Sequence, residues 1–254
     1  AENYSWSSTY QLMAIILSIN IFLSIYISVE KPNSELVKLN YQKSLIEPVI
    51  DFFNRFGLKI ASMLLLIIAT YRLTDIVMGP MANPFYIDMG YSLSEIGYVV
   101  KVVALIATII GIFIGGIFIK RLGLYQSLLI AAFLVMMTNL LFSYASINEK
   151  NLTLLACIVA SDSLAAGIVG TVNITFLTSL VSAKYTGFQY ALLTSLMAFL
   201  GKIFGGFSGV VVENFQSSYG FNYGWMSFYI FTSLLAIPAI ILILFNKNFF
   251  LLQK

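Results

Sequence analysis

Long apolar segments are the feature of this sequence that most limits its possible folds. An α-helix needs about 20 largely apolar residues to cross roughly 30 Å of hydrocarbon. Backbone polar groups find no water there, and a helix pairs them within its own segment. The sequence therefore predicts an all-α membrane protein with about seven transmembrane helices. We expect these helices at residues 10–28, 58–78, 94–119, 126–146, 152–181, 188–212 and 226–245.

Composition excludes several classes of soluble protein and of enzyme. Only 10% of the 254 residues are charged, against about 25% in an ordinary soluble domain. Histidine is absent and Cys157 is the single cysteine, which excludes His-dependent catalytic triads, His-based zinc sites and disulfides. The net charge of +3 is small and dispersed, so nucleic acid is not an expected partner. We expect no enzyme activity, no cofactor and no metal.

The distribution of basic residues predicts the orientation of the helices. Cytoplasmic loops carry an excess of Lys and Arg. Ten basic residues fall in loops or tails on one side, whereas only Lys150 falls on the other. We therefore expect the N-terminus outside and the C-terminus in the cytoplasm. The ten are Lys31, Lys38, Lys43, Arg55, Lys59, Lys120, Arg121, Lys184, Lys247 and Lys254.

A stretch of about 30 residues separates the first predicted span from the second. Apolar residues recur there at helical spacing, which predicts an amphipathic helix on the inner surface, starting near Pro48. They are Leu45, Ile46, Val49, Ile50, Phe53 and Phe56. The expected organisation is one span (1–28), a cytoplasmic linker (29–57) and a six-helix bundle (58–254). Two span starts carry capping-box patterns, Ser92 with Glu95 and Thr186 with Gln189.

Five charged residues fall inside predicted spans: Arg72, Asp75, Lys101, Asp162 and Lys202. A charge near the bilayer centre costs at least about 2.5–3.5 kcal/mol, so it should face the protein interior or an aqueous cavity. Arg72 and Asp75 are one turn apart and can neutralise each other, and Lys101 can reach the outer interface. Asp162 has no partner in its own helix. The set favours a polar pathway over a solid apolar bundle.

Glycines four residues apart predict close helix packing. Gly111 and Gly115 share one span, and Gly201, Gly205 and Gly209 share another. Such spacing lets helix backbones approach each other in a membrane. Static packing and sliding helices are both compatible with this pattern.

Residues 115–123 resemble the signature loop of the major facilitator superfamily. In that pattern a glycine, three apolar residues, an acid, a base, any residue and a glycine follow one another; here the positions are Gly116, Lys120, Arg121 and Gly123. Lys120 replaces the acid of this gating loop. The resemblance implies two six-helix halves joined by a long cytoplasmic loop, with inverted repeats in each half. The chain would then hold the last helix of the first half, the linker and the second half.

More specifically, the chain resembles the AmpG muropeptide permease family. The residues that carry this resemblance are PVIDFF (48–53), YRLTD (71–75), EIGYVVK (95–101), ATIIGIFIGG (107–116), residues 162–170 and QYALLTS (189–195). Asp162 stands where that family tends to have glutamate, and Lys202 where it tends to have arginine. The family resemblance implies proton-coupled import of anhydromuropeptides across a bacterial inner membrane.

The same resemblance implies roles for the buried charges. Asp75 and Asp162 become candidates for proton coupling. Arg72, Lys101 and Lys202 become candidates for binding substrate carboxylates or for gate ion pairs. Three positive and two negative side chains leave a net charge of +1, which suits an anionic sugar-peptide. The expected partners are the lipid bilayer, that substrate and a missing N-terminal half.

Three other readings remain open. A seven-helix receptor fits the helix count and orientation, but no lysine for a retinal Schiff base lies in 226–245. The long inner loop and the five buried charges also argue against a receptor. A membrane enzyme would need paired polar residues at one membrane face, and none stands out. The chain can also be a non-functional transporter remnant, or a subunit that needs the other half of the fold.

Overall fold

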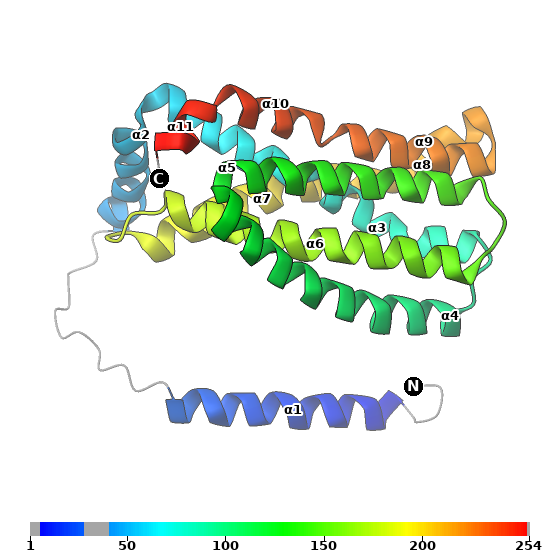
Figure 1. Cartoon of the computed structure of the whole chain (residues 1–254). Helices are drawn as coiled ribbons and strands as arrows, with labels where there is room; N and C mark the ends of the chain where they lie inside the picture. Colours follow the sequence, from blue (N-terminus) through cyan, green and yellow to red (C-terminus); the bar gives the residue numbers. More distant parts are fainter. Residues whose placement is uncertain (1–5, 28–40, 253–254) are drawn as a thin grey trace. The chain divides into compact units, whose positions relative to one another are not determined.

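The computed structural model describes residues 6–27 and 41–252, and every regular element among them is a helix (Figure 1). The chain divides into two units. The first holds helix α1 (Trp6–Ile27), and the second begins at Leu45. The second unit contains α2 (Tyr41–Tyr71) from Leu45 on, α3 (Leu73–Asp88), α4 (Leu93–Tyr98), the π-helix η1 (Val99–Val103), α5 (Ala104–Ser146), α6 (Leu152–Leu180), α7 (Thr186–Gly206), α8 (Ser208–Tyr219), α9 (Phe221–Leu234), α10 (Ile237–Phe245) and α11 (Lys247–Leu252).

Two glycines divide long helical runs into separate helices. Gly57 has φ 71° and ψ 157° within α2, and Gly123 has φ 80° and ψ 168° within α5. Glycine adopts positive φ without a steric penalty, so the chain turns sharply at both positions. Five helical stretches of the described chain are long and apolar enough to cross a membrane, and α1 is a shorter apolar helix. Because Gly123 divides the 54-residue stretch Leu93–Ser146, the expectation of about seven helices is confirmed.

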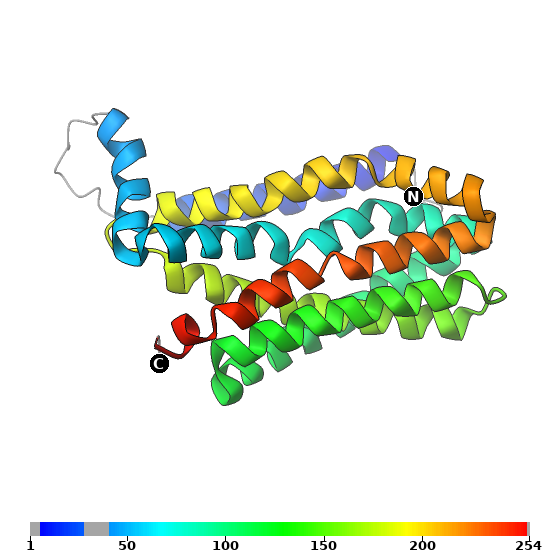
Figure 2. The same cartoon turned by 90° about the horizontal axis from the view of Figure 1, so that it is seen from above.

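The helices of the second unit run side by side as an antiparallel bundle (Figure 2). Helix α5 packs most extensively against α6 and next against α9, while α3 packs against α7. Small side chains and neutral hydroxyls at these contacts keep the helices close. Ser208, for example, donates a hydrogen bond to the Val77 backbone oxygen at 2.7 Å, which joins the α7–α8 break to α3.

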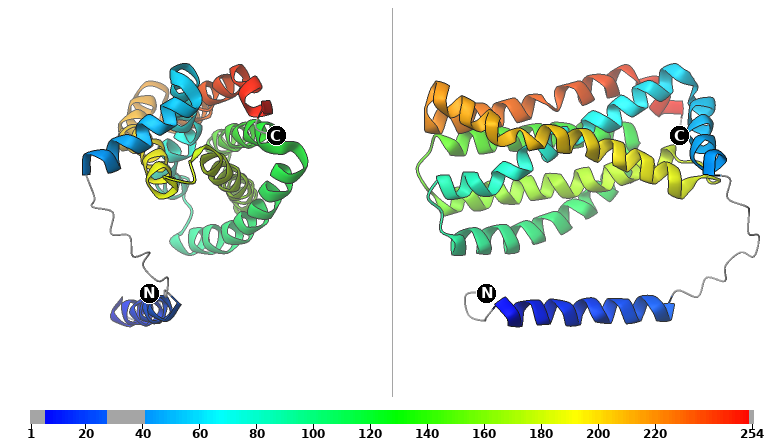
Figure 3. Two further views of the ribbon diagram at one scale, coloured as in Figure 1. Left: turned by 90° about the vertical axis from the view of Figure 1, so that its left-hand side faces the viewer. Right: turned by 180° about the vertical axis from the view of Figure 1, so that it is seen from behind.

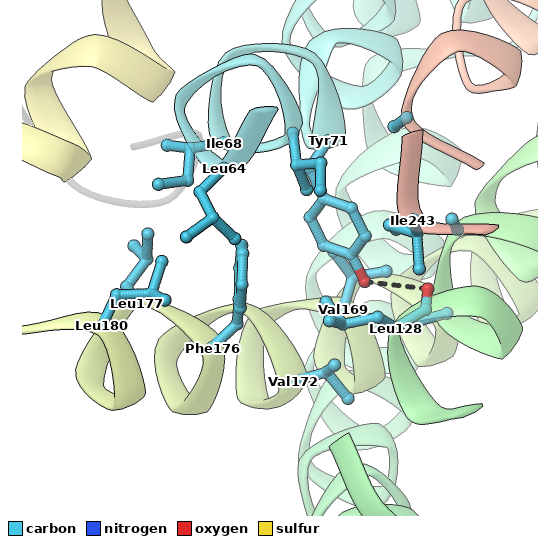
Figure 4. Packing of buried hydrophobic residues seen from close by; sticks show 14 of the residues in the cluster. Leu64, Ile68, Tyr71, Leu128, Val169, Val172, Phe176, Leu177, Leu180 and Ile243 are labelled. Carbon is cyan, nitrogen blue, oxygen red and sulfur yellow. Dashed lines mark hydrogen bonds between the residues drawn. The ribbon is translucent and has the colours of Figure 1, made fainter. Parts of the chain in front are cut away.

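Two hydrophobic clusters fill the bundle. The inner cluster lies near the turn at Gly57 and includes Ile68, Phe176 and Ile243. Figure 4 shows this cluster, with the Tyr71 hydroxyl donating to the Leu128 backbone oxygen at 3.3 Å. The outer cluster is aromatic and lies toward the other end of the bundle. It holds Phe85, Tyr86, Phe142, Trp225, Phe228 and Tyr229.

The helix that was predicted at residues 58–78 is longer than expected. The helix continues past residue 78 to Asp88, through Pro80 and Pro84. Proline removes a backbone hydrogen bond and usually ends a helix. Here Phe85 is buried in the outer cluster, and this burial favours continuation of the helix.

The amphipathic helix exists, but its start was predicted wrongly. Helix α2 begins at Tyr41, so Pro48 lies inside it. From Leu45 on, this first part of α2 crosses the end of the bundle beside the α6–α7 turn (Figure 3). Phe52 is buried against the bundle, whereas Ile50 is exposed. One apolar face therefore packs on protein, and another is free for the membrane interface.

One of the two capping-box predictions is confirmed. The Ser92 hydroxyl accepts from the Glu95 backbone N–H at 3.2 Å, and the Glu95 carboxylate accepts from the Ser92 N–H at 2.7 Å. The second prediction is wrong. Tyr185 is the N-cap of α7, and the Thr186 hydroxyl donates back to the Ser182 backbone oxygen at 2.8 Å. The Gln189 side chain forms its hydrogen bonds with other residues, among them Pro48 and Asp51.

Candidate functional site

A charged pair occupies the break between α2 and α3. Arg72 has non-helical angles, φ −105° and ψ 10°, and its side chain turns onto Asp75. The Arg72 Nη2 and Nε atoms lie 3.3 and 3.4 Å from Asp75 Oδ2. The two side chains are 31% and 20% exposed. The pair is therefore only partly buried.

Asp162 lies on α6 and has a neutral partner. The Thr138 hydroxyl, from the second part of α5, lies 3.1 Å from Asp162 Oδ1. The same hydroxyl lies 3.0 Å from the Val135 backbone oxygen, so two acceptors share one proton. No ion pair to Asp162 occurs within residues 6–27 and 41–252. Asp162 is thus a half-buried carboxyl group without a cation beside it.

The two carboxylates are electrostatic neighbours. Asp75 on α3 is close enough to Asp162 on α6 for the two negative charges to repel each other. In the described part of the chain, Arg72 is the one basic residue that forms an ion pair with either of these carboxylates, and its partner is Asp75. Two acids beside one guanidinium carry an excess negative charge when both are ionised. A proton or a cationic group would remove that excess.

Neutral polar residues beside this charged group were missed by the sequence reasoning. Asn139 is buried and accepts from the Thr232 hydroxyl at 2.8 Å, which links α5 to α9. Ser233 donates to the Met136 backbone oxygen at 3.0 Å on the same interface. A search for neutral polar residues inside apolar runs would have found these positions, because each such residue needs a partner in a membrane.

Lys101 and Lys202 stand apart from the carboxylates. Both residues are exposed, and neither forms an ion pair with any residue that the structure describes. Lys101 lies in the π-helix η1, which packs against α6. Lys202 follows Gly201 on α7, the helix that packs against α3. Of the five predicted charges, the structure brings together Arg72, Asp75 and Asp162.

The residues predicted as a gating loop end at the sharp turn between the two parts of α5, and Gly116, Lys120 and Arg121 lie in the helix before it. Gly123 has the positive φ that this turn requires. Lys120 and Arg121 are exposed and make no ion pair with the described part of the chain. A Cβ atom added at Gly116 would meet no atom within 4 Å. Because they are exposed, the side chains of Lys120 and Arg121 can contact a residue outside this helix.

Four of the five predicted packing glycines lie against a neighbouring helix. A Cβ at Gly111 would overlap the Leu164 backbone oxygen, and one at Gly115 would lie 3.1 Å from the Ile168 oxygen, both on α6. Gly201 and Gly205 lie against Ile76 of α3 in the same way. The fifth, Gly209, has more room.

At Gly209 an added Cβ would first meet the Met81 Cε atom, at 3.9 Å. That is ordinary van der Waals contact, so this position does not need glycine. Gly167, which the sequence reasoning passed over, does need it. A Cβ there would overlap the Thr108 backbone oxygen.

An open groove of about 400 Å³ lies between the η1–α5 helix and α6, and its lining does not include Asp162. Ser161, its neighbour in sequence, belongs to the lining, but the rest of that lining is apolar. The groove is bordered by Val103, Ile106, Ala107, Ile110, Ala160 and Leu164. The polar groups of the candidate site are therefore Arg72, Asp75 and Asp162 rather than the groove lining.

Comparison with known proteins places this arrangement in a family. The family model described as Major Facilitator Superfamily matches residues 1–206. The transporter AmpG 4 of Rickettsia felis is 28% identical over 96% of this chain and 58% of its own length. The transporter AmpG 1 of Rickettsia prowazekii is 33% identical over 82% of this chain and 47% of its own length.

The anhydromuropeptide permease of Escherichia coli K12 is 31% identical over 94% of this chain and 46% of its own length. The chain thus spans about half the length of the curated relatives it matches. No solved structure matches it significantly. The relatives are transporters and permeases rather than enzymes, and the resemblance to AmpG-type proteins is confirmed. With five long apolar helical stretches, a shorter apolar helix and a family match over most of its length, this multi-pass membrane protein belongs to the major facilitator superfamily.

Proposed function

We propose that this chain takes part in proton-coupled import of anhydromuropeptides across a bacterial inner membrane. It would supply the second six-helix half of the transporter and the helix that precedes it. The observation that carries the proposal is the group of Arg72, Asp75 and Asp162 inside the bundle. Intramembrane ionisable residues are costly and generally mark a pathway for ions or substrate. The anhydromuropeptide permease among the relatives supports the choice of substrate.

Asp162 is the better candidate of the two for carrying the proton. The Asp75 carboxylate is held by Arg72 at 3.3 Å, so protonating it would break an ion pair. Asp162 is bonded to a neutral hydroxyl, and protonating it breaks none. The proton would neutralise the excess negative charge that two neighbouring carboxylates create. Asp75 then serves to hold Arg72 in place.

The basic residues fit the substrate side of the proposal. Arg72 is 31% exposed and presents a planar guanidinium, which suits bidentate binding of a carboxylate. Lys101 and Lys202 are exposed, and we propose that they face a cavity completed by the other half of the fold. The basic loop residues support an N-terminus outside and a cytoplasmic C-terminus.

The test replaces Asp162 with Asn in the full-length transporter. We expect Asp162→Asn to abolish proton-driven accumulation of labelled anhydromuropeptide, while exchange of substrate across the membrane continues. Asp88→Asn is the matched control, because Asp88 accepts a bond from the Trp225 indole at 3.0 Å and an amide oxygen can accept it too. Proton-driven accumulation by Asp162→Asn at the parent rate would refute the coupling role.

A second test addresses the need for a partner half. We expect the isolated chain in proteoliposomes to show no uptake, because the cavity forms between two halves in this fold. Co-expression with a first-half bundle should restore uptake. Proton-dependent accumulation by the isolated chain would show that it works without such a partner.

A further inference from the structure

The Thr138 hydroxyl holds one hydrogen between two acceptors. It lies 3.1 Å from Asp162 Oδ1 on α6 and 3.0 Å from the Val135 backbone oxygen on its own helix. A hydroxyl has a single hydrogen to donate, so it serves one of these acceptors at a time. The Thr138 side chain is buried, so bulk water is not a third partner. The direction of its bond therefore depends on which acceptor is the stronger.

The charge of Asp162 decides between the two acceptors. Hydrogen bonds to a charged group are shorter and roughly twice as strong as those between neutral groups. Ionised Asp162 therefore takes the Thr138 hydrogen in preference to the Val135 oxygen. A protonated carboxyl group is itself a donor, and the Thr138 hydroxyl oxygen lies within its reach at 3.1 Å. The bond to Asp162 then reverses, and the Thr138 hydrogen turns to Val135.

The Val135 backbone oxygen extends this change along α5. In a helix, one of its two lone pairs accepts from the backbone N–H four residues on, which is that of Asn139. The Asn139 side-chain amide donates to the same oxygen at 3.0 Å. A Thr138 hydroxyl that turns to Val135 competes with this amide for the remaining lone pair. Asn139 is 0% exposed, so its amide cannot replace the lost bond with one to bulk water.

Asn139 connects α5 to α9. Its amide oxygen accepts from the buried Thr232 hydroxyl at 2.8 Å. The same hydroxyl lies 3.1 Å from the Tyr229 backbone oxygen, so Thr232 also has one hydrogen and two acceptors. When the Asn139 amide moves, Thr232 keeps a partner within its own helix. Helix α5 packs against both α6 and α9, and it therefore carries a hydrogen-bonded chain from one to the other.

We propose that Thr138 is a positioning residue that passes the protonation state of Asp162 across α5 to Thr232. A proton adds to Asp162 Oδ1 and forms an O–H bond, the hydrogen bond to Thr138 reverses, and no proton leaves Thr138. The Asn139 amide then loses its place on the Val135 oxygen, and the α5–α9 contact changes. The use of this chain in transport rests on the proposed coupling role of Asp162, whereas the chain of bonds does not.

Other titratable groups act on Asp162 from the neighbouring helices. They are the Asp75 carboxylate and the Tyr86 phenol on α3 and the Tyr229 phenol on α9. Lys101 on η1 and Lys202 on α7 are exposed, and neither forms an ion pair within residues 6–27 and 41–252. A pH change therefore alters several groups, and the contribution of Asp162 has to be identified with its variant.

Difference infrared spectroscopy between high and low pH, on the protein in lipid membranes, tests the relay. We expect a carboxyl band that is absent in Asp162→Asn. We also expect a side-chain amide band that shifts in protein made with 13C-labelled asparagine, because the Asn139 bond changes. Thr138→Val should abolish the amide change, since it removes the hydroxyl at nearly constant volume. Thr138→Ser, which keeps a hydroxyl, should retain the amide change.

The parent protein tests the relay even if Thr138→Val does not fold. Absence of an asparagine-sensitive change on protonation would overturn the proposal, because protonation of Asp162 on Oδ2 would leave Thr138 donating as before. An amide change that survives in Thr138→Val would also overturn it, since the signal would then bypass this hydroxyl.

A double-mutant cycle in Tm provides the second measurement. Thr138 and Thr232 are joined through Val135 and Asn139, so the Tm change of the double variant Thr138→Val/Thr232→Val should differ from the sum of the single changes. Thr178→Val is the matched control, because Thr178 on α6 is exposed and bonds to its own helix. Its change should add to that of Thr138→Val. Additivity for both pairs would overturn the relay.

The relay and the coupling role fail separately. An asparagine band that depends on Asp162, together with full proton-driven uptake in Asp162→Asn, would keep the relay and refute the coupling role. Uptake that depends on Asp162, without any asparagine band, would refute the relay and keep the coupling role.

Discussion

The side-chain amide of Gln189 donates a hydrogen bond to the backbone oxygen of Pro48, 2.8 Å away, across 141 residues of chain. The same nitrogen also lies 3.0 Å from an Asp51 carboxylate oxygen. On its other side, the amide oxygen accepts from the Ser182 N–H at 2.6 Å and from the Arg55 guanidinium at 3.1 Å. A single buried amide thereby ties the amphipathic part of α2 to the turn between α6 and α7.

We expect Gln189→Leu to destabilise the protein by about 3 kcal/mol. Gln189 is 1% exposed, and leucine would leave several buried partners unsatisfied, each at a cost of about 1–3 kcal/mol. Thermal unfolding in detergent and limited proteolysis near Gly57 would measure the change. Gln126→Leu is the control, because Gln126 is exposed and near the same end. An equal Tm shift for both variants would contradict this role of Gln189.

The error over Gln189 shows where sequence reasoning stops. Thr186 and Gln189 have capping-box spacing, and that local pattern predicts a local bond. The actual partners Pro48 and Asp51 are remote in sequence. Only the way α2 crosses the end of the bundle brings them near. The Ser92–Glu95 box was predictable, because both of its bonds are local.

Glycine substitutions should separate positions at helix contacts from free ones. We expect Gly111→Ala to lower stability by about 1–3 kcal/mol, because its new methyl group would overlap the Leu164 backbone oxygen. Gly116→Ala should be neutral or stabilising, since an added Cβ there meets nothing within 4 Å and alanine favours the helix. Tm measurements on both variants provide the check. A larger loss at Gly116 than at Gly111 would be incompatible with the observed α5–α6 contact.

The proposed orientation can be tested by cysteine labelling in intact cells. In a Cys157→Ser background, we expect a membrane-impermeant maleimide to label Lys150→Cys and not Lys184→Cys. Lys150 lies between α5 and α6, and Lys184 lies at the opposite end of α6. The background change is needed because Cys157 is exposed. Permeabilised cells should show labelling at both positions, and the opposite pattern in intact cells would reverse the proposed orientation.

The helices were predictable because transmembrane length and hydropathy are properties of each segment alone. The Arg72–Asp75 pair was predictable for a similar reason, since its partners are one turn apart. The Thr138–Asp162 bond was not, because it joins α5 to α6 and involves a neutral hydroxyl that a search for charges overlooks. The grouping of Asp162 with Asp75, and the exposure of Lys101, likewise depend on tertiary packing.

The three charged residues predict an asymmetric response to mutation. Removing the cation by Arg72→Gln would leave Asp75 and Asp162 as neighbouring carboxylates without a counterion. Removing one acid by Asp75→Asn leaves Arg72 free to turn toward Asp162. We therefore expect Arg72→Gln to lower the Tm more than Asp75→Asn does. Breaking a fully buried pair costs about 3–5 kcal/mol, and these partly exposed side chains should lose less.

The double variant makes this prediction sharper. Adding Asp75→Asn to Arg72→Gln removes one of the two unpaired carboxylates, so it should recover part of the lost Tm. Glu95→Gln serves as the reference for an ordinary exposed pair. Glu95 meets Lys150 at 2.8 Å, yet such surface pairs contribute only about 0–1 kcal/mol. If Asp75→Asn proved more damaging than Arg72→Gln, or if the double variant were the least stable, the neighbouring Asp162 carboxylate would not be acting on this pair.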